Sequence, residues 1–310
     1  MINKLMIGRM GNQMFQYATM RAIQLKYYPD EDINLNFTLV YKEGEMAKGF
    51  KNQLECFNLA PHFVDKKINI SFSQKIWFLR YYLGYKILKI FARGDYEVAK
   101  RKYEIRLQPK LQKRGLFLFS FGYFRFEKSD KKNKLFVGFY ESDKYFDGIR
   151  NVLRTEFEPK YPERIENAEL YKIIRDKESI CISIRRGDFL APDQIEKNYV
   201  CTVEYFQKGI ELMKEKISDP KFVVFSDDIK WVRENMKFPD GTIFENGDDP
   251  VWEKLRLMYN CKHFIISNST FSWWAQYLSK NDKNKIVIAP KIWKNSGFND
   301  DIYQDGWIRI

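Results

Sequence analysis

The feature that most constrains the fold is a series of four short apolar runs, separated by amphipathic stretches, in the second half of the chain. The runs are ICISI, KFVVF, HFIIS and KIVIA, which begin at Ile180, Lys221, His263 and Lys285. The stretches between them include YFQKGIELMKEKI and DPVWEKLRLMYN, whose apolar residues recur every three or four positions. The apolar runs predict buried strands, and this periodicity predicts helices. Alternating strands and helices indicate a parallel sheet covered by helices, so the predicted fold class is α/β.

A segment with two prolines divides the chain into parts of similar length. The 310 residues suffice for two domains of about 150 residues each. The segment FEPKYPER, residues 157–164, follows the helical stretch IRNVLRTEF and carries alternating charges. We therefore expect an N-terminal α/β domain over residues 1–157, a C-terminal α/β domain over residues 165–295, and a tail over residues 296–310 that packs back on the body.

Two adjacent arginines and an aspartate follow the run ICISI. Arg185, Arg186 and Asp188 lie in the sequence SIRRGD. A guanidinium group is a planar fork of donors that stays charged, and it matches phosphate oxygens better than an ammonium group does. The two arginines are thus predicted to bind a diphosphate leaving group. Asp188 could orient a guanidinium, cap the next segment or accept a proton; a surface ion pair that contributes little to stability is the alternative.

A glycine-containing segment near the N-terminus is the second candidate site. The sequence IGRMGNQMFQYATMRA joins a short apolar run, residues 5–7, to an apolar helical stretch. Gly8 and Gly11 would let the backbone approach a ligand, and the N-terminus of the following helix would direct N–H groups toward it. The segment is neither the dinucleotide fingerprint nor a Walker A loop. A structural glycine turn without a ligand is the alternative.

A run of hydroxyl side chains after HFIIS is the third candidate. Ser269, Thr270 and Ser272 lie in the sequence SNSTFSWW, where a helix is expected to begin. Together with the helix N–H groups they would converge on an anion or a sugar ring. An ordinary capped helix is the alternative.

In this order along the chain, the three segments resemble glycosyltransferase family 11, the α-1,2-fucosyltransferases. Further matching blocks are FYESDKYF (139–146), FSDD (225–228), VIAPKIW (287–293) and the final DGWIRI. The resemblance extends from about residue 5 to the end and is weakest between roughly 60 and 135. It implies a GT-B-like fold of two Rossmann-like α/β domains facing a cleft. The implied reaction is inverting transfer of L-fucose from GDP-β-L-fucose to the 2-hydroxyl of a terminal β-galactose on a glycan.

The resemblance also implies roles for individual residues. Arg185 and Arg186 would hold the β-phosphate of GDP-fucose. Apart from the resemblance, the position of Asp188 next to two arginines favours a role as their organiser rather than as a strong base. Ser183 stands where related fucosyltransferases commonly have histidine, so no base contact is carried over to it. The remaining donor-binding residues would be Gly11, Asn12 and Gln13 from the N-terminal domain, Ser269, Thr270 and Ser272 on the phosphate and ribose side, and Asp227 or Asp228 on guanine N–H groups.

Neither a metal ion nor a cofactor is expected besides the donor substrate. Asp227 and Asp228 are adjacent, neighbouring strand residues point to opposite faces, and two carboxylates make a poor cage for a divalent cation. The four cysteines are far apart and form no Cys-x-x-Cys pair, so buried, reduced thiols are predicted.

Positive charge is concentrated in one segment. Residues 65–134 contain 19 Lys and Arg and 6 Asp and Glu, whereas the rest of the chain is nearly balanced at 34 and 35. Within this segment, IWFLRYYLGYKILKIFARG, residues 76–94, interleaves aromatic and cationic residues. This pattern suits an interfacial helix on an anionic membrane, and the cations Arg80, Lys86 and Lys89 exclude a bilayer span. An amphipathic helix packed on the N-terminal domain is one alternative; nucleic-acid binding is another, but no recognised module supports it.

The N-terminus shows no signal-peptide pattern, so we expect a cytoplasmic enzyme, peripheral at the inner membrane face if the basic segment contacts lipid. Animal members of the family that the chain resembles carry a membrane anchor, and the resemblance therefore implies a bacterial enzyme. Two rival functions remain at this point. A transferase using another nucleotide sugar would share the arginine turn. A non-catalytic glycan-binding or membrane-surface protein would account for the basic segment, but not for three phosphate-binding elements in one chain.

Overall fold

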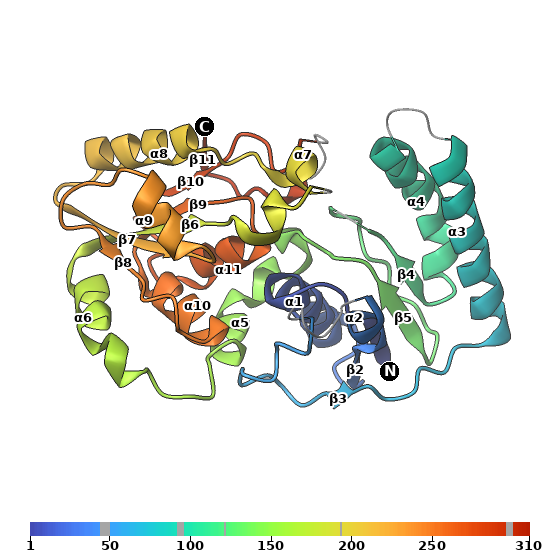
Figure 1. Ribbon diagram of the computed structural model, residues 1–310. Helices are drawn as coiled ribbons and strands as arrows, with labels where there is room; N and C mark the ends of the chain where they lie inside the picture. The colour runs from blue at the N-terminus through green and yellow to red at the C-terminus, as the bar shows by residue number, and fades with distance from the viewer. Residues whose placement is uncertain (44–49, 92–95, 121, 193, 296–299) are drawn as a thin grey trace. The chain divides into compact units, whose positions relative to one another are not determined.

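The computed structural model describes residues 1–310 apart from 44–49, 92–95, 121, 193 and 296–299 (Figure 1). Its described residues form two compact units. Unit 1 comprises Met1–Glu55, Leu59–Glu156 and Phe298–Ile302, and unit 2 comprises Cys56–Asn58, Phe157–Gly297 and Tyr303–Ile310. Each unit contains a parallel β-sheet with helices, which confirms the predicted α/β class.

Unit 1 is built on a parallel sheet with strand order β3-β2-β1-β5-β4. Its strands are β1 (Ile2–Leu5), β2 (Ile33–Asn36), β3 (Phe63–Val64), β4 (Leu116–Leu118) and β5 (Lys134–Val137). Strand β1 ends at Leu5, so the apolar run of residues 5–7 begins at the last residue of the strand and continues into the loop after it.

The helices of unit 1 are α1 (Met10–Tyr27), α2 (Thr38–Glu43), α3 (Phe72–Phe91), α4 (Tyr96–Gln112) and α5 (Arg150–Glu156). Helix α1 contacts both β1 and β2, and most of its residues are buried. It ends at Tyr27 because Pro29 disfavours helical backbone in the residue before it.

Helices α3 and α4 pack together beside β4 and β5 (Figure 1). Gly84 permits their close approach, because a Cβ at this position would lie 2.0 Å from the hydroxyl of Tyr103. The Tyr81 hydroxyl also donates to Glu104 Oε1 at 2.6 Å. Helix α3 spans Phe72–Phe91 and confirms the helix predicted within residues 76–94. Residues 92–94 of that prediction lie outside the described part of the chain. None of the described helices has the length and apolar composition that a membrane span requires.

Unit 2 contains a parallel sheet with strand order β11-β10-β9-β6-β7-β8. Its strands are β6 (Glu178–Ile184), β7 (Pro220–Ser226), β8 (Ile243–Phe244), β9 (His263–Ile266), β10 (Val287–Ala289) and β11 (Ile308–Arg309). The four predicted strands are β6, β7, β9 and β10. Strand β11 places the last residues of the chain beside β10, with Ile308 opposite Ile288. Residues 296–299 of the predicted tail lie outside the described residues.

The helices of unit 2 are α6 (Ala168–Asp176), α7 (Ile195–Asn198), α8 (Val203–Lys216), α9 (Ile229–Asn235), α10 (Val251–Asn260) and α11 (Thr270–Leu278). The two helices predicted between the apolar runs are α8 and α10. Trp273 and Trp274 of α11 are fully buried, and the ring of Trp274 lies edge-on to that of Phe157. All four cysteines are buried and unpaired, as predicted, and burial raises the pKa of Cys201 to about 12.

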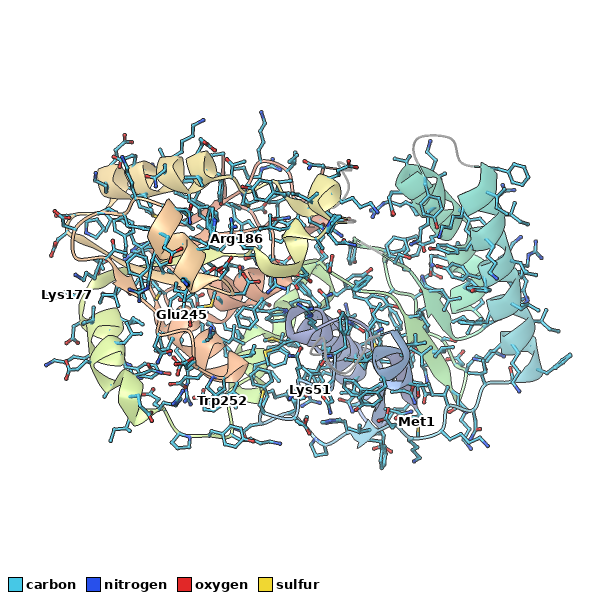
Figure 2. All side chains as sticks on the ribbon, in the orientation of Figure 1. Met1, Lys51, Lys177, Arg186, Glu245 and Trp252 are labelled. Atoms are coloured by element: carbon cyan, nitrogen blue, oxygen red, sulfur yellow. The ribbon has the colours of Figure 1, made fainter. Side chains whose placement is uncertain are left out.

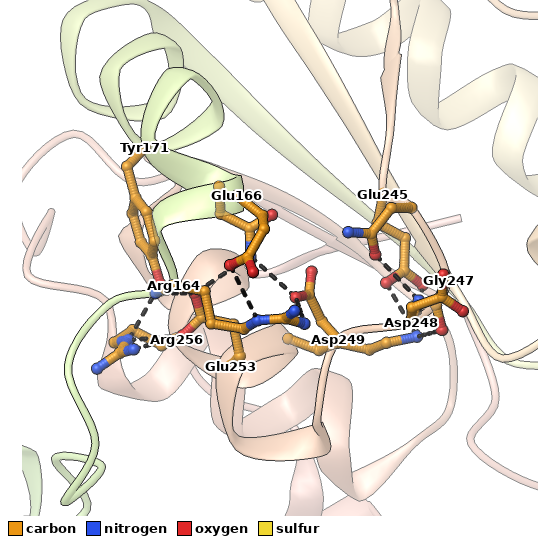
Figure 3. A network of polar contacts seen from close by, with 12 residues as sticks. Arg164, Glu166, Tyr171, Glu245, Gly247, Asp248, Asp249, Glu253 and Arg256 are labelled. Atoms are coloured by element: carbon orange, nitrogen blue, oxygen red, sulfur yellow. Dashed lines mark hydrogen bonds and ion pairs between the residues drawn. The ribbon is translucent and has the colours of Figure 1, made fainter.

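A buried polar network holds the segment before α6 against α10 (Figure 3). Arg256 donates to the carbonyl oxygens of Tyr161 at 2.7 Å and Pro162 at 2.6 Å. Its Nε also donates to the Tyr171 hydroxyl and to Glu253, each at 3.0 Å. Because the side chains of Arg256 and Glu253 are 5% and 0% exposed, this ion pair is part of the interior of unit 2.

Candidate active site

The loops after β6 and β7 bring the predicted arginines and aspartates together. The two strands pair in parallel along their whole length, from Glu178 opposite Pro220 to Ile184 opposite Ser226. Residues that directly follow both strands therefore lie at one edge of the sheet, where Arg186 is seen in Figure 2. The carboxyl edge of a parallel sheet is the usual ligand site of open α/β folds.

Each arginine of this turn is held by carboxylates. Arg185 Nη1 lies 2.8 Å from Asp227 Oδ2, and Arg185 Nη2 pairs with Asp188. Arg186 Nε lies 3.3 Å from Asp228 Oδ2. The arginine side chains are 24% and 12% exposed, so both are oriented by the protein and still reach its surface. A guanidinium group has five N–H donors, and these ion pairs use only one or two in each.

Trp231 provides a further support that the sequence did not reveal. Its ring lies beneath the guanidinium of Arg186, with 3.1 Å between the guanidinium carbon and the ring centroid. Stacking on an aromatic face favours a cation and restricts its orientation. The signal in the sequence was weak, because a tryptophan three residues after Asp228 is compatible with many helices.

Gly187 gives Asp227 the room to reach the turn. The backbone N–H of Arg186 donates to Asp227 Oδ1 at 2.9 Å. A Cβ on Gly187 would lie 2.3 Å from Asp227 Oδ2, which is closer than real Cβ contacts allow. The glycine is needed here for close approach rather than for an unusual backbone angle.

The prediction that Asp227 and Asp228 point to opposite faces of a strand is wrong. Strand β7 ends at Ser226, and Asp228 is the N-cap of α9, accepting a hydrogen bond from the Trp231 N–H at 3.3 Å. Both carboxylates contact arginines of the same turn. Among the residues that the structure describes, no three His, Cys, Asp or Glu side chains gather into a metal site. Guanine recognition and independence of metal stay predictions.

The hydroxyl residues lie beside the arginine turn because β6 and β9 are neighbouring strands. Ser272 Oγ is buried, 2.6 Å from Ser183 Oγ and 3.2 Å from Ser267 Oγ, so its hydroxyl joins α11 to the ends of both strands. Ser269 is the N-cap of α11 and accepts from the Phe271 N–H at 3.3 Å. Ser269 and Thr270 are half-buried and thus more accessible to a ligand than Ser272.

The N-terminal candidates belong to unit 1. Helix α1 begins at Met10, so Gly11, Asn12 and Gln13 lie in its first turn. Gly8 has a φ of +74°, and a Cβ on it would lie 2.4 Å from Asn12 Nδ2. Gly8 therefore makes room for the Asn12 side chain.

Gln13 has a structural role within unit 1. Its fully buried amide donates to the carbonyl oxygens of Gly8 at 2.9 Å and Lys51 at 2.8 Å, and accepts from the Gln53 N–H at 2.9 Å. Gln53 in turn caps the helix by accepting from the Met10 N–H at 2.6 Å. These bonds fix the segment around residue 51 onto α1, and a direct donor contact by Gln13 stays a prediction.

Comparison with known proteins agrees with the family resemblance of the sequence motifs. The family model described as glycosyl transferase family 11 matches residues 1–310. An alpha-1,2-colitosyltransferase of Escherichia coli is 30% identical over 317 residues, covering 98% of this chain and 96% of that protein. A galactoside alpha-(1,2)-fucosyltransferase 1 of Saimiri boliviensis boliviensis is 29% identical over 156 residues, covering 47% of this chain and 43% of that protein.

A solved structure supports the fold. NodZ alpha-1,6-fucosyltransferase co-crystallised with GDP matches with a TM-score of 0.53 and 13% identity, over 89% of this chain and 91% of that chain. At this identity the likeness concerns the fold alone. Together with the two parallel-sheet units, it confirms the predicted GT-B-like class.

Proposed function

Because the chain belongs to glycosyl transferase family 11, we propose that it transfers L-fucose from GDP-β-L-fucose to the 2-hydroxyl of a terminal β-galactose, with inversion at the anomeric carbon. The observation that carries this proposal is the arginine turn after β6. It holds two partly exposed guanidinium groups in fixed orientation at the carboxyl edge of the sheet. The alpha-1,2-linkage named for both relatives supports the position of transfer.

The proposed chemistry follows from the charge that develops during the reaction. Breaking the bond between fucose and GDP places positive charge on the sugar ring and negative charge on the departing diphosphate. Preorganised cations next to the leaving group lower this barrier most directly. Arg185 and Arg186 would serve this purpose, because Asp227 and Trp231 already restrict their orientation.

The arginine turn has more negative than positive charge. Two guanidinium groups contact three carboxylates, so a diphosphate would meet a cluster with one excess negative charge. The diphosphate would therefore rely on the guanidinium N–H donors that the carboxylates leave unused. Asp227 or Asp228 would accept hydrogen bonds from guanine N–H groups. Asp188 stays on Arg185 as its organiser, and the acceptor proton goes to another carboxylate or to water.

A closely related donor is the second candidate. The bacterial relative is an alpha-1,2-colitosyltransferase, and colitose is L-fucose without its 3-hydroxyl. Both sugars would carry the same GDP leaving group, so the arginine turn suits either.

The decisive experiment compares donors. The purified chain is incubated with GDP-fucose, GDP-colitose, GDP-mannose or UDP-galactose and an array of galactose-terminated acceptors, and the product linkage is read by NMR. We expect the highest kcat/KM with GDP-fucose, an α-1,2 product, and the same rate in EDTA. Preference for GDP-colitose would select the second candidate. Use of UDP-galactose alone would refute both, and absence of GDP binding by calorimetry would favour a non-catalytic protein.

A further inference from the structure

Helix α3 is apolar on two faces, and only its inner face is covered. Trp77, Phe78 and Tyr81 pack against the apolar cluster formed by α4, β4 and β5. The outer face carries a row of large apolar side chains that are between 49% and 78% exposed. This outer row consists of Phe72, Ile76, Leu79, Leu83, Ile87 and Ile90.

The spacing of the outer row makes it continuous. Successive members are three or four residues apart, and a helix has about 3.6 residues per turn, so all six lie on one stripe along α3. Single exposed apolar residues are ordinary on protein surfaces, whereas a contiguous patch marks an interaction site. Figure 1 shows α3 as the outer helix of the α3 and α4 pair.

Cations border the outer row on both sides. By helical position, Lys75, Lys86 and Lys89 lie along one side of the row and Arg80 along the other. All four are exposed, and none forms an ion pair with a described residue. On α4, the exposed residues Lys102, Arg106 and Lys110 add further positive charge.

We propose that this face of unit 1 binds the surface of an anionic lipid bilayer, with α3 lying in the plane of the interface. The apolar row would enter the boundary between headgroups and acyl chains, while the bordering lysines and Arg80 contact lipid phosphates. An anionic bilayer accommodates the apolar row in its acyl region and the cations at its phosphate groups. This inference is independent of the sugar donor and acceptor proposed above.

The charge pattern disfavours two other occupants. Helix α3 contains no Asp or Glu, so pairing with a second copy would bring cations against cations with no carboxylate between them. A nucleic acid would neutralise the cations through its phosphates and leave the apolar row in water.

Vesicle sedimentation tests the proposal directly. The full chain is mixed with vesicles of phosphatidylglycerol and phosphatidylethanolamine, or of phosphatidylcholine alone, at low and high salt. We expect binding to the anionic vesicles that weakens with salt, and little binding to phosphatidylcholine. Equal binding to both vesicles, or binding to neither, would overturn the proposal without the use of any variant.

Two variants locate the surface. L79S/L83S/I87S removes the apolar side chains at the centre of the outer row. K75E/K86E/K89E reverses the charge of the three lysines beside the row. The first variant should no longer sediment with the vesicles. The second should have an affinity for anionic vesicles that is lower by about 100-fold or more, because each cation lost lowers this affinity by about 5-fold. The control K172E/K177E/K216E makes the same charge change at exposed lysines of unit 2 and should bind as wild type does.

Two further readouts complete the test. Donor turnover with a water-soluble acceptor should stay normal in both α3 variants, which shows that they are folded. Analytical ultracentrifugation of the wild-type chain should give the same mass as the L79S/L83S/I87S variant. A larger wild-type mass that this variant loses would assign the outer row to a second copy and overturn the proposal.

Discussion

Two of the clusters in unit 2 in which arginine binds carboxylate differ in how many guanidinium donors are used within the protein. At α10, each nitrogen of Arg256 has a partner, among them two backbone carbonyls, and its side chain is 5% exposed (Figure 3). After β6, Arg185 and Arg186 contact carboxylates through only part of their donors and are 24% and 12% exposed.

The difference shows how one kind of ion pair can serve two purposes. Where every donor is used and the pair is buried, the arginine fixes the positions of the segments around it. Where guanidinium N–H donors remain unused at the surface, the carboxylate orients the guanidinium so that it can bind a ligand. This contrast leads to predictions that separate effects on stability from effects on turnover.

The largest expected effect is the loss of stability in Arg256→Met. Removal of this guanidinium leaves the fully buried carboxylate of Glu253 without its cation, which typically costs about 3–5 kcal/mol. Urea unfolding measures the change. The control is Arg175→Met, whose partner Glu163 is exposed, so the change there should stay below about 1 kcal/mol. Equal effects of the two substitutions would contradict the distinction between buried and exposed pairs.

Arg185→Ala should lower turnover strongly and leave stability almost unchanged. It removes a cation from the leaving group, and loss of one such donor lowers turnover by about 10²- to 10³-fold, or about 2.7–4 kcal/mol. Because the side chain is partly exposed, the urea midpoint should hardly move. Steady-state transfer from GDP-fucose measures the first quantity, and Arg185→Lys should recover only part of the rate since it restores charge without the fork. Near-normal turnover by a folded Arg185→Ala protein would refute the role.

Much of unit 2 could be predicted from the sequence, because its central strands are buried on both sides and are therefore continuous apolar runs. The two-residue strands β3, β8 and β11 are too short to leave such a pattern. Helix α3 was predicted as a helix, but its covered and uncovered sides could not be told apart. Because α3 has large apolar side chains on two faces, the sequence pattern alone does not show which face is covered.

The candidate site was predicted as a set of residues but not as a set of contacts. Arg185 and Arg186 are conspicuous because two like charges are adjacent in the sequence, with the opposite charge of Asp188 two residues further on. Strand alternation predicts opposite directions for Asp227 and Asp228, but β7 ends at Ser226, so the alternation does not apply to them. Gly187 and Trp231 were missed because their importance depends on a second segment that only folding brings close.

Gly187→Ala tests the first of these missed contacts. Its Cβ would push Asp227 away from Arg185 and misplace the guanidinium, and a small displacement of this kind costs about 10- to 100-fold in kcat/KM. The effect should shrink in an Asp227→Ala background, because the colliding carboxylate is absent there. An equal loss in both backgrounds would mean that the alanine acts through some other contact.

Trp231→Leu should have the smallest effect of the series. The substitution removes the ring beneath Arg186, and such a contact contributes about 0.5–2 kcal/mol, so kcat/KM should fall by about 2- to 30-fold. Helix α9 keeps its cap, because Asp228 accepts from the backbone N–H of residue 231 whatever the side chain is. Trp231→Phe retains an aromatic face and should lose less than Trp231→Leu does. If both variants turn over donor equally well, the ring does not position Arg186, and its carboxylate contact alone orients that guanidinium.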